Sequence, residues 1–315
     1  MATVLAGDID AFDHRDLIAS IPDDMRAQLT ERRDVPGLLR FAVHFGVVLA
    51  LATAMAIWPT SWPWLVVPQG VLIVFLFTAL HETIHDTAFA SPWLNRATGW
   101  VCAAAIALPP LWFRYFHLAH HRHTHDPRHD PELASPKPEN WREYLIYLSG
   151  WRYWSGMAKV VAVNALQQNR DVFVPERRHG DIAREARILL GVYAALAAVS
   201  IAASSDLLLK VWIAPVLLGQ PFLRAYLLAE HARCPHVENM LSNTRTTFTT
   251  AFVRFIAWNM PYHAEHHSWP AVPFHRLPAL HAFARERLQV TENGYARFHA
   301  VYAATLGAGK RRNSR

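Results

Sequence analysis

Residues 62–86 read WPWLVVPQGVLIVFLFTALHETIHD and join a long apolar run to a cluster of histidines. The apolar part, Trp62–Leu80, is close to the ~20 residues that a helix needs to cross a bilayer. A similar apolar run, Phe41–Trp58, precedes it, with Pro59 and Pro63 at the junction. The two runs predict a hairpin of membrane-spanning helices, with histidines where the second helix leaves the membrane.

A second pair of apolar runs lies in the later half of the chain, Ile188–Ala203 and Leu207–Leu228. Only 18% of the 315 residues are charged, and 52% are hydrophobic. An ordinary soluble domain carries about a quarter charged residues. The shorter segment Trp100–Trp112 contains Pro109 and Pro110, so we expect it to be re-entrant, interfacial or buried. The composition and the runs together predict an all-α integral membrane protein with four transmembrane helices in two hairpins.

The positions of lysine and arginine predict the orientation of these helices. The connections Trp58–Trp62 and Ala202–Asp206 contain neither residue type, whereas the head, the segment His81–Arg187 and the tail after His231 contain nearly all of them. This is the positive-inside pattern with both termini cytoplasmic, and it argues against a soluble protein with buried helices. It also explains the net charge of +6 without nucleic acid, because the chain has no nucleic-acid-binding motif. The Arg-rich, Ala-rich composition favours a bacterial source and therefore the inner membrane.

The segments outside the spans are expected to form the cytoplasmic part of the protein. Residues 1–40 lack the features of a signal peptide and predict a cytoplasmic N-terminal segment. Asn140–Ala162 has aromatic residues at helical spacing, which suits a helix in the membrane interface or a core helix of a cytoplasmic cap. Gln167–Arg187 is polar and predicts a surface loop leading into the next span. We expect a membrane domain over residues 41–281 and a cytoplasmic tail over 282–315.

Nineteen histidines are present, and many of them fall into three clusters on the side predicted to be cytoplasmic. The clusters read HETIHD at 81–86, HLAHHRHTHD at 117–126 and HAEHH at 263–267. Residues at i, i+3 and i+4 share one helix face, so each cluster can direct two or three imidazoles to one centre. Imidazole binds iron, zinc, copper and nickel. Because one zinc site takes about four ligands, this set is large enough for two metal ions.

Two other classes of protein are compatible with part of this pattern. His81-Glu82-x-x-His85 also fits the zinc metalloprotease signature, which would indicate an intramembrane protease. That hypothesis leaves the second and third clusters without a role and offers no clear third ligand. A metal-binding or transport protein without catalysis is a further alternative.

The three clusters, their order and their separations resemble the histidine boxes of the membrane fatty acid desaturase superfamily. This superfamily includes acyl desaturases, membrane alkane hydroxylases and carotenoid ketolases. The run HHRHTHDPRHDPEL over His120–Leu133 is similar to the continuation of the family's second box. The residues that match the boxes are His81 and His85; His117, His120 and His121; and His263, His266 and His267.

The resemblance implies two iron ions held almost wholly by histidine, with O2 as co-substrate and a lipid or acyl substrate from the membrane. It also implies a further ligand just after the last span, for which His231 is the first candidate and His236 the rival. Some acyl-CoA desaturases have an asparagine four residues before this histidine. Leu227 stands there in this chain, which favours a ligand set made of histidine alone.

Carboxylates beside the boxes are candidates to accept the second ring N–H of a ligating histidine. They are Asp86, Asp126, Asp130, Glu132, Glu230 and Glu265, and Asn259 and Tyr262 are further candidates. His125 could share the helix face of His121, whereas His123 is expected at the surface. The isolated histidines are expected to be structural: His14, His44, His275, His281 and His299. We expect no catalytic residues beyond the metal ligands.

The expected reaction is an O2-dependent, non-haem di-iron desaturation that introduces a double bond into a lipid acyl chain. The alternative on the same scaffold is a hydroxylase or ketolase acting on an alkane, a sphingoid base or a carotenoid. The chain has no Gly-rich dinucleotide-binding motif, and Cys102 and Cys234 cannot hold an iron–sulfur cluster. The electrons are therefore expected from a separate donor of the ferredoxin or cytochrome type.

Overall fold

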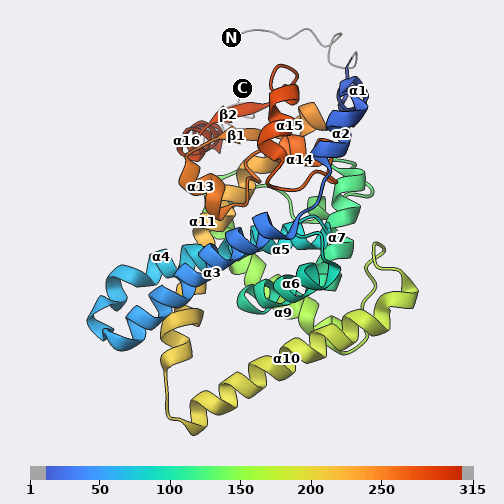
Figure 1. Cartoon of the computed structure of the whole chain (residues 1–315). Coiled ribbons are helices and arrows are strands. Elements are labelled where there is room, and N and C mark those ends of the chain that lie inside the picture. Colours follow the sequence, from blue (N-terminus) through green and yellow to red (C-terminus); the bar gives the residue numbers. More distant parts are fainter. Residues whose placement is uncertain (1–11, 307–315) are drawn as a thin grey trace, which may run out of the picture.

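The computed structural model describes residues 12–306 and is helical over most of its length (Figure 1). The ends of the expected terminal segments, residues 1–11 and 307–315, lie outside the described residues. Four stretches are long and apolar enough to cross a membrane, which confirms the expected number of spans: Asp23–Ile57, Pro59–Ile84, Glu176–Ala202 and Leu209–His231. The helices that form them are α3 (Asp34–Ile57), α4 (Trp62–Val74) with α5 (Leu76–Ile84), α10 (His179–Ala202), and a π-helical segment (Leu209–Ile213) with α11 (Ala214–His231).

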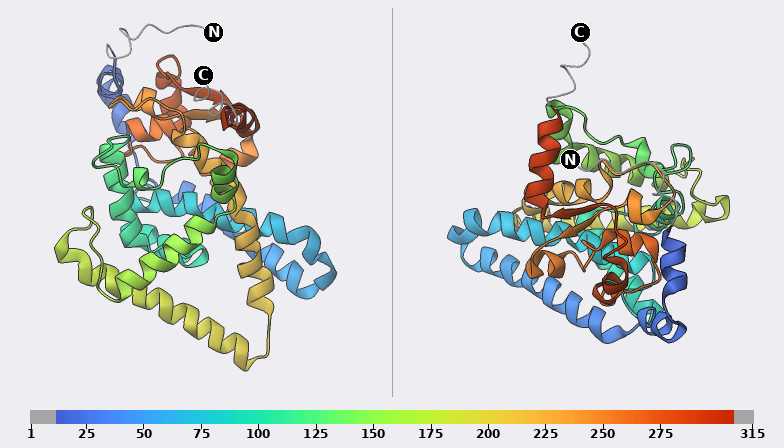
Figure 2. Two further views of the ribbon diagram at one scale, coloured as in Figure 1. Left: turned by 180° about the vertical axis from the view of Figure 1, so that it is seen from behind. Right: turned by 90° about the horizontal axis from the view of Figure 1, so that it is seen from above.

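The spans present apolar side chains to their surroundings. On α10, Ile188, Val199 and Ile201 are exposed, Ile201 at 79% of its surface. A helix exposed to water would not carry such a continuous apolar face, whereas lipid accommodates it. Figures 1 and 2 show the two hairpins extending in different directions from the helical body, with α14 to α16 at the opposite end. The protein is a multi-pass membrane protein.

The second and fourth spans approach each other backbone to backbone. A Cβ atom on Gly70 would overlap the carbonyl of Pro215, and one on Gly219 would overlap the backbone of Gly70. Small residues at such crossings let membrane helices approach closely. This contact brings α5, which continues from α4, close to the end of α11. It therefore positions the first histidine cluster near His231.

The segment Trp100–Trp112 contains a sharp bend between two helices. α6 (Pro92–Ile106) and α7 (Pro110–His123) meet at 97°. Ala107, at the junction, has a left-handed backbone with φ of 57°, and Pro110 starts α7 at a position where its missing N–H costs nothing. Cys102 and Ile106 are buried, as the buried alternative expects, and the sharp bend also fits a re-entrant pair of helices.

The aromatic stretch after α7 forms two helices, α8 (Trp141–Leu148) and α9 (Trp151–Ala165). The break falls at Gly150, whose φ of 73° is a left-handed conformation that favours glycine. Trp141 and Trp151 are exposed, as expected of interfacial aromatic residues. On α9, the Tyr153 hydroxyl donates to the carbonyl of Ile106 at 2.8 Å, which attaches this pair of helices to α6.

The rest of the chain forms a cap of short elements over the ends of the spans that carry the histidines. Leu17 of α1 packs against Leu241 and Ala284, so the N-terminal helices belong to this cap. The only sheet within residues 12–306 is a parallel pair that aligns Thr246 with Thr291. The cap elements are α1 (His14–Ser20), α2 (Asp23–Leu29), α12 (Met240–Asn243), β1 (Thr246–Phe248), α13 (Ala251–Ile256), α14 (His263–Ser268), α15 (Leu277–Ala284), β2 (Thr291–Asn293) and α16 (Tyr295–Leu306). Short 3-10 turns cover Pro59–Ser61, Pro131–Ala134 and Glu176–Arg178.

Candidate metal centre

Four helices end at one place between the spans and the cap, and each brings histidines to it. α5 supplies one histidine from its last turn and one from its C-cap, and α7 supplies three from its last two turns. The last residue of α11 is a histidine, and the six-residue helix α14 supplies three more. The nine residues are His81, His85, His117, His120, His121, His231, His263, His266 and His267.

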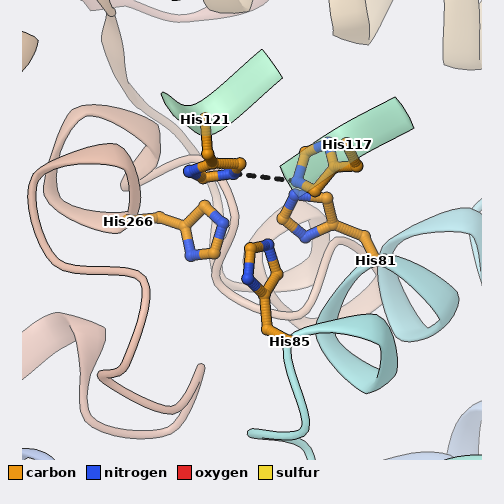
Figure 3. A group of neighbouring side chains, drawn as sticks. All are labelled: His81, His85, His117, His121 and His266. Atoms are coloured by element: carbon orange, nitrogen blue, oxygen red, sulfur yellow. Dashed lines mark hydrogen bonds between the residues drawn. The ribbon is translucent and has the colours of Figure 1, made fainter. Parts of the chain in front are cut away.

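Five of these side chains form what we call the five-histidine group: His81, His85, His117, His121 and His266. One ring nitrogen from each lies within 4.8 Å of one from every other member. Figure 3 shows the five rings directed toward a common centre from three segments of the chain. The Nε2 atoms of His117 and His121 are 2.8 Å apart.

The other four side chains form the second histidine group: His120, His231, His263 and His267. Ring nitrogens of His120, His231 and His267 all lie within 4.8 Å of one another. The Nε2 atom of His231 is 3.2 Å from the Nε2 atoms of both His120 and His263. The two groups touch where the rings of His121 and His267 stack with centroids 4.0 Å apart.

Adjacent residues of the sequence are divided between the two groups. His120 belongs to the second group and His121 to the first, and the same division holds for His267 and His266. Successive residues of an α-helix point about 100° apart, so each H-H pair faces two centres at once. The doubled histidine of the second and third boxes therefore fits two neighbouring metal ions.

Three observations show that the donor set fits a metal ion. Buried ring nitrogens without any hydrogen-bond partner are numerous, including both nitrogens of His81 and of His266 and the Nε2 atom of His267. Metal–imidazole bonds of about 2.0–2.1 Å place neighbouring ligand nitrogens roughly 3 Å apart, which matches the contacts of 2.8 to 3.2 Å. Burial lowers the pKa of His263 to about 3, so this imidazole is in the neutral form that binds metal.

Two side chains fix the orientation of rings in the second group. The Oδ1 atom of Asp130 accepts from Nδ1 of His120 at 2.9 Å, which directs Nε2 of this ring into the group. The Thr124 hydroxyl donates to the carbonyl of His120 and lies 3.2 Å from Nδ1 of His267, so it can accept from that ring. Such partners hold a ligating imidazole in one tautomer and one orientation. Thr124 was not anticipated from the sequence, because nothing in its local spacing connects it to the third box.

Among the acids proposed as ring partners, Asp130 and Glu132 both meet His120, and Glu230 has its Oε1 atom 3.5 Å from Nδ1 of His263. The other candidates meet different partners. Asp86 pairs with Arg114 at 2.9 Å, and Asp126 pairs with His129 at 2.6 Å on the loop after α7.

Two more of the expected ring partners have structural contacts in the cap. Asn259 donates to the carbonyl of Phe274 at 2.9 Å, and Glu265 contacts both Thr246 and His281. For these four residues the expectation is wrong. Proximity in the sequence did not indicate on which side of the helix end each side chain lies.

The remaining histidines lie outside both groups. α11 ends at His231, and the turn that follows leaves His236 exposed, so His231 is the one that joins the centre. His125 is buried, but the helix has ended and its φ of 65° directs the chain away. His44 and His299 bond the carbonyls of Leu72 and Ala225, as expected of structural histidines.

Glu82, the residue that a zinc metalloprotease would need as its base, serves the packing of the cap. Its Oε1 atom accepts from the backbone N–H of Phe274 at 2.8 Å, and the side chain is fully buried. A general base must reach the water that it activates. The geometry therefore does not support the protease hypothesis.

A cavity of about 350 Å³ lies against the membrane side of the centre, and His81, His117, His120, His231 and His263 form part of its wall. Phe77, Phe113 and Leu227 also line it, and each stands one helical turn before a histidine of the centre. The cavity is therefore apolar directly beneath the histidines. Its size and lining suit a lipid chain.

Comparison with known proteins agrees with these features. Residues 56–300 match the family model described as fatty acid desaturase. The chain is also 27% identical over 238 residues to the sphingolipid delta(4)-desaturase DES1 of Drosophila melanogaster, a match that covers 72% of this chain and 68% of that protein.

Proposed function

Because the chain belongs to the fatty acid desaturase family, we propose that it is an O2-dependent di-iron enzyme that introduces a double bond into a lipid acyl chain. Membership of the family makes it an oxidoreductase of the desaturase type, acting on lipid. The observation that supports the finer statement is the division of nine converging histidines into two groups beside one apolar cavity. One zinc ion takes about four ligands and would leave most of these imidazoles unbound.

In this proposal the five-histidine group holds one iron and the second histidine group holds the other. When bound, the two irons supply the oxidising chemistry, using O2 and two electrons to remove hydrogen from an unactivated C–H bond. Imidazole is a suitable ligand for iron. Imidazole ligands bound to metal carry no charge. The nearby carboxylates of Asp130, Glu132 and Glu230 would therefore balance the positive charge of the two metal ions.

The protein's own contribution is to position the chain and to exclude water. Phe77, Phe113 and Leu227 form apolar walls one turn below the histidines, so a chain in the cavity passes close to the centre. The metal-facing rings are buried: His81 and His267 are each 3% exposed and His266 is 0% exposed. A dry, fixed environment strengthens electrostatic interactions and prevents side reactions of a strong oxidant.

The same scaffold could serve a hydroxylase or ketolase, and the product distinguishes these activities. The curated relative is named a sphingolipid desaturase, which favours formation of a double bond over oxygenation. We also propose a separate ferredoxin- or cytochrome-type donor, because Cys102 and Cys234 are both buried and isolated. The charge pattern supports cytoplasmic termini, and the Arg-rich, Ala-rich composition supports a bacterial inner membrane.

The test is expression of the full chain in membranes together with a reducing system, followed by analysis of total lipids by mass spectrometry. We expect lipids two hydrogens lighter than their parents and about two irons per chain. Oxygenated lipids without any new double bond would replace desaturation by hydroxylation or ketolation. Protein that folds and inserts but retains no iron would contradict the di-iron assignment.

A further inference from the structure

One cation in the cavity has no partner of opposite charge. Arg224 of α11 lines the cavity, and its Nε atom is enclosed without a hydrogen-bond acceptor. Its guanidinium carbon lies 4.8 Å from the centre of the Tyr153 ring, and it makes no ion pair within residues 12–306. A guanidinium has five N–H donors, and leaving them unused in a membrane helix is costly. Such a residue is expected to have a ligand.

The other charged groups around the cavity already have partners or lie at its edge. Lys137 is paired with Glu132, and Arg152 is exposed at the start of α9. Glu230, six residues after Arg224 on α11, faces Nδ1 of His263. The cavity wall therefore carries a net positive charge that is concentrated at Arg224.

Arg224 also lies at a useful distance from the metal centre. It precedes His231 by seven residues, which is about 10 Å along the helix axis. Leu227 stands between them on the same face of α11 and lines the same cavity. A lipid whose head is held at Arg224 would therefore extend several methylene groups before it reaches the centre.

We propose that Arg224 binds the anionic head of the lipid substrate, a carboxylate or a similar pair of anionic oxygens, with the acyl chain directed toward the histidines. This inference rests on the proposed function and names its substrate class. The planar guanidinium matches a carboxylate with two parallel hydrogen bonds, and the stacked Tyr153 ring leaves the fork free for them. The phosphate of a bilayer phospholipid offers the same chemistry and is the competing source.

The experiment compares binding of palmitate and of hexadecan-1-ol to the full-length, metal-loaded protein in detergent, without reductant. Wild type is expected to prefer palmitate. R224Q is expected to weaken palmitate binding about tenfold to hundredfold and to leave hexadecan-1-ol binding unchanged. R224K, which keeps the charge but not the fork, should fall between them. R142Q, at an exposed site of α8 outside the cavity wall, is the matched control.

Each outcome bears on the inference without requiring turnover. An equal loss of both ligands in R224Q, or no loss of either, would overturn it. In a parallel arm, nanodiscs of phosphatidylglycerol and of phosphatidylcholine are compared. If R224Q removes only a preference for phosphatidylglycerol, Arg224 is a site for the anionic head group of a bilayer phospholipid and the substrate role is wrong. Absence of lipid oxidation with intact palmitate selectivity would contradict the proposed function alone.

A separate observation concerns Glu132, whose carboxylate faces the metal side of the second histidine group. Its Oε2 atom is 3.1 Å from Nε2 of His120. Because Asp130 occupies the Nδ1 side of that ring at 2.9 Å, Nε2 is the nitrogen directed to the metal. The same Nε2 atom is 3.2 Å from Nε2 of His231. The carboxylate oxygen is therefore close enough to Nε2 of His120, the metal-facing nitrogen of that ring, for both atoms to bind one ion.

The geometry points to Glu132 as a carboxylate ligand of the metal ion held by the second histidine group. Its other oxygen pairs with Lys137, so the carboxylate can approach the ion through Oε2. This differs from the ligand set of histidine alone that Leu227 had favoured. It makes the two metal sites chemically unequal, one neutral in its ligands and one carrying a negative charge.

Co²⁺ titration of metal-depleted, full-length protein tests this without measuring activity. E132Q is expected to weaken one of two Co²⁺ sites by more than about tenfold and to change the visible absorption of bound Co²⁺. E139Q is the matched control, because Glu139 is exposed further along the same segment and lies outside both histidine groups. K137M breaks the same ion pair but retains the carboxylate, so it is expected to bind both ions. An E132Q protein with two unchanged Co²⁺ sites and an unchanged spectrum would overturn the assignment.

Discussion

The two histidine groups lie side by side but are held in place in different ways. Within residues 12–306, no member of the five-histidine group bonds a carboxylate, and both ring nitrogens of His81 and His266 have no partner in the protein. In the second group His120 contacts Asp130 and Glu132, and His263 faces Glu230. Helix packing alone positions the first group, whereas side-chain hydrogen bonds position the second.

This difference predicts that the two centres respond differently to substitution. In the first group only the loss of a ligand itself has a large effect, because there are no supporting side chains to remove. In the second group the acids contribute charge and orientation, so substitutions outside the ligands also weaken metal binding. The acids lie on one side of the pair, which gives the two metal ions unequal surroundings.

The largest effect is expected from removing adjacent histidines one at a time. H266A is expected to lose the metal of the five-histidine group, and H267A the metal of the second group. Each variant should retain about one metal ion per chain instead of two and form no detectable product, since both ions are needed for the reaction. Metal analysis of the purified proteins and mass spectrometry of the lipids measure these outcomes.

Loss of both metal ions in each of these variants would show that the two groups behave as one site, which contradicts their division into two separate metal sites. The control is H236A, a histidine that lies outside both groups and is exposed. It should retain two metal ions and full activity. Membrane insertion and thermal unfolding of each variant confirm that the fold is intact.

A smaller effect is expected from D130N. Asp130 accepts from Nδ1 of His120, and such partners typically contribute 10–100-fold, as an order of magnitude, to metal affinity or activity. The substitution should weaken Co²⁺ binding at one site by about this factor and leave the other unchanged. D126N is the matched control, because Asp126 pairs with His129 on the same loop, away from the centre. Equal weakening of both sites would mean that the groups are not positioned independently.

The sequence was sufficient to predict the spans and the histidines of the three boxes. Apolar runs of bilayer length and the placement of arginine gave four spans, and spacing of three and four residues indicated shared helix faces. These patterns are local and depend on helix geometry alone. The resemblance to the histidine boxes then named eight residues, all of which the structure brings together.

The partners of the histidines could not be predicted in the same way. Asp126 and Asp130 are equally plausible in the sequence, but α7 ends at His123 and the left-handed His125 turns the loop, so that Asp130 folds back onto His120. The same loop brings Glu132 and Lys137 to the cavity. Such contacts depend on where a helix stops and how the next loop closes, which spacing does not determine.

The smallest effect is expected from T124V, which tests whether His267 belongs to the second histidine group. The Thr124 hydroxyl lies 3.2 Å from Nδ1 of His267, and valine keeps the shape of the side chain while it removes this partner. One neutral hydrogen bond contributes about 1 kcal/mol, so Co²⁺ binding should weaken about fivefold at one site. T305V, which removes a hydroxyl that bonds the backbone of α16, is the control and should leave both sites unchanged. If T124V weakens the five-histidine site instead, His267 belongs with that group, and the division of adjacent histidines between two metals is wrong.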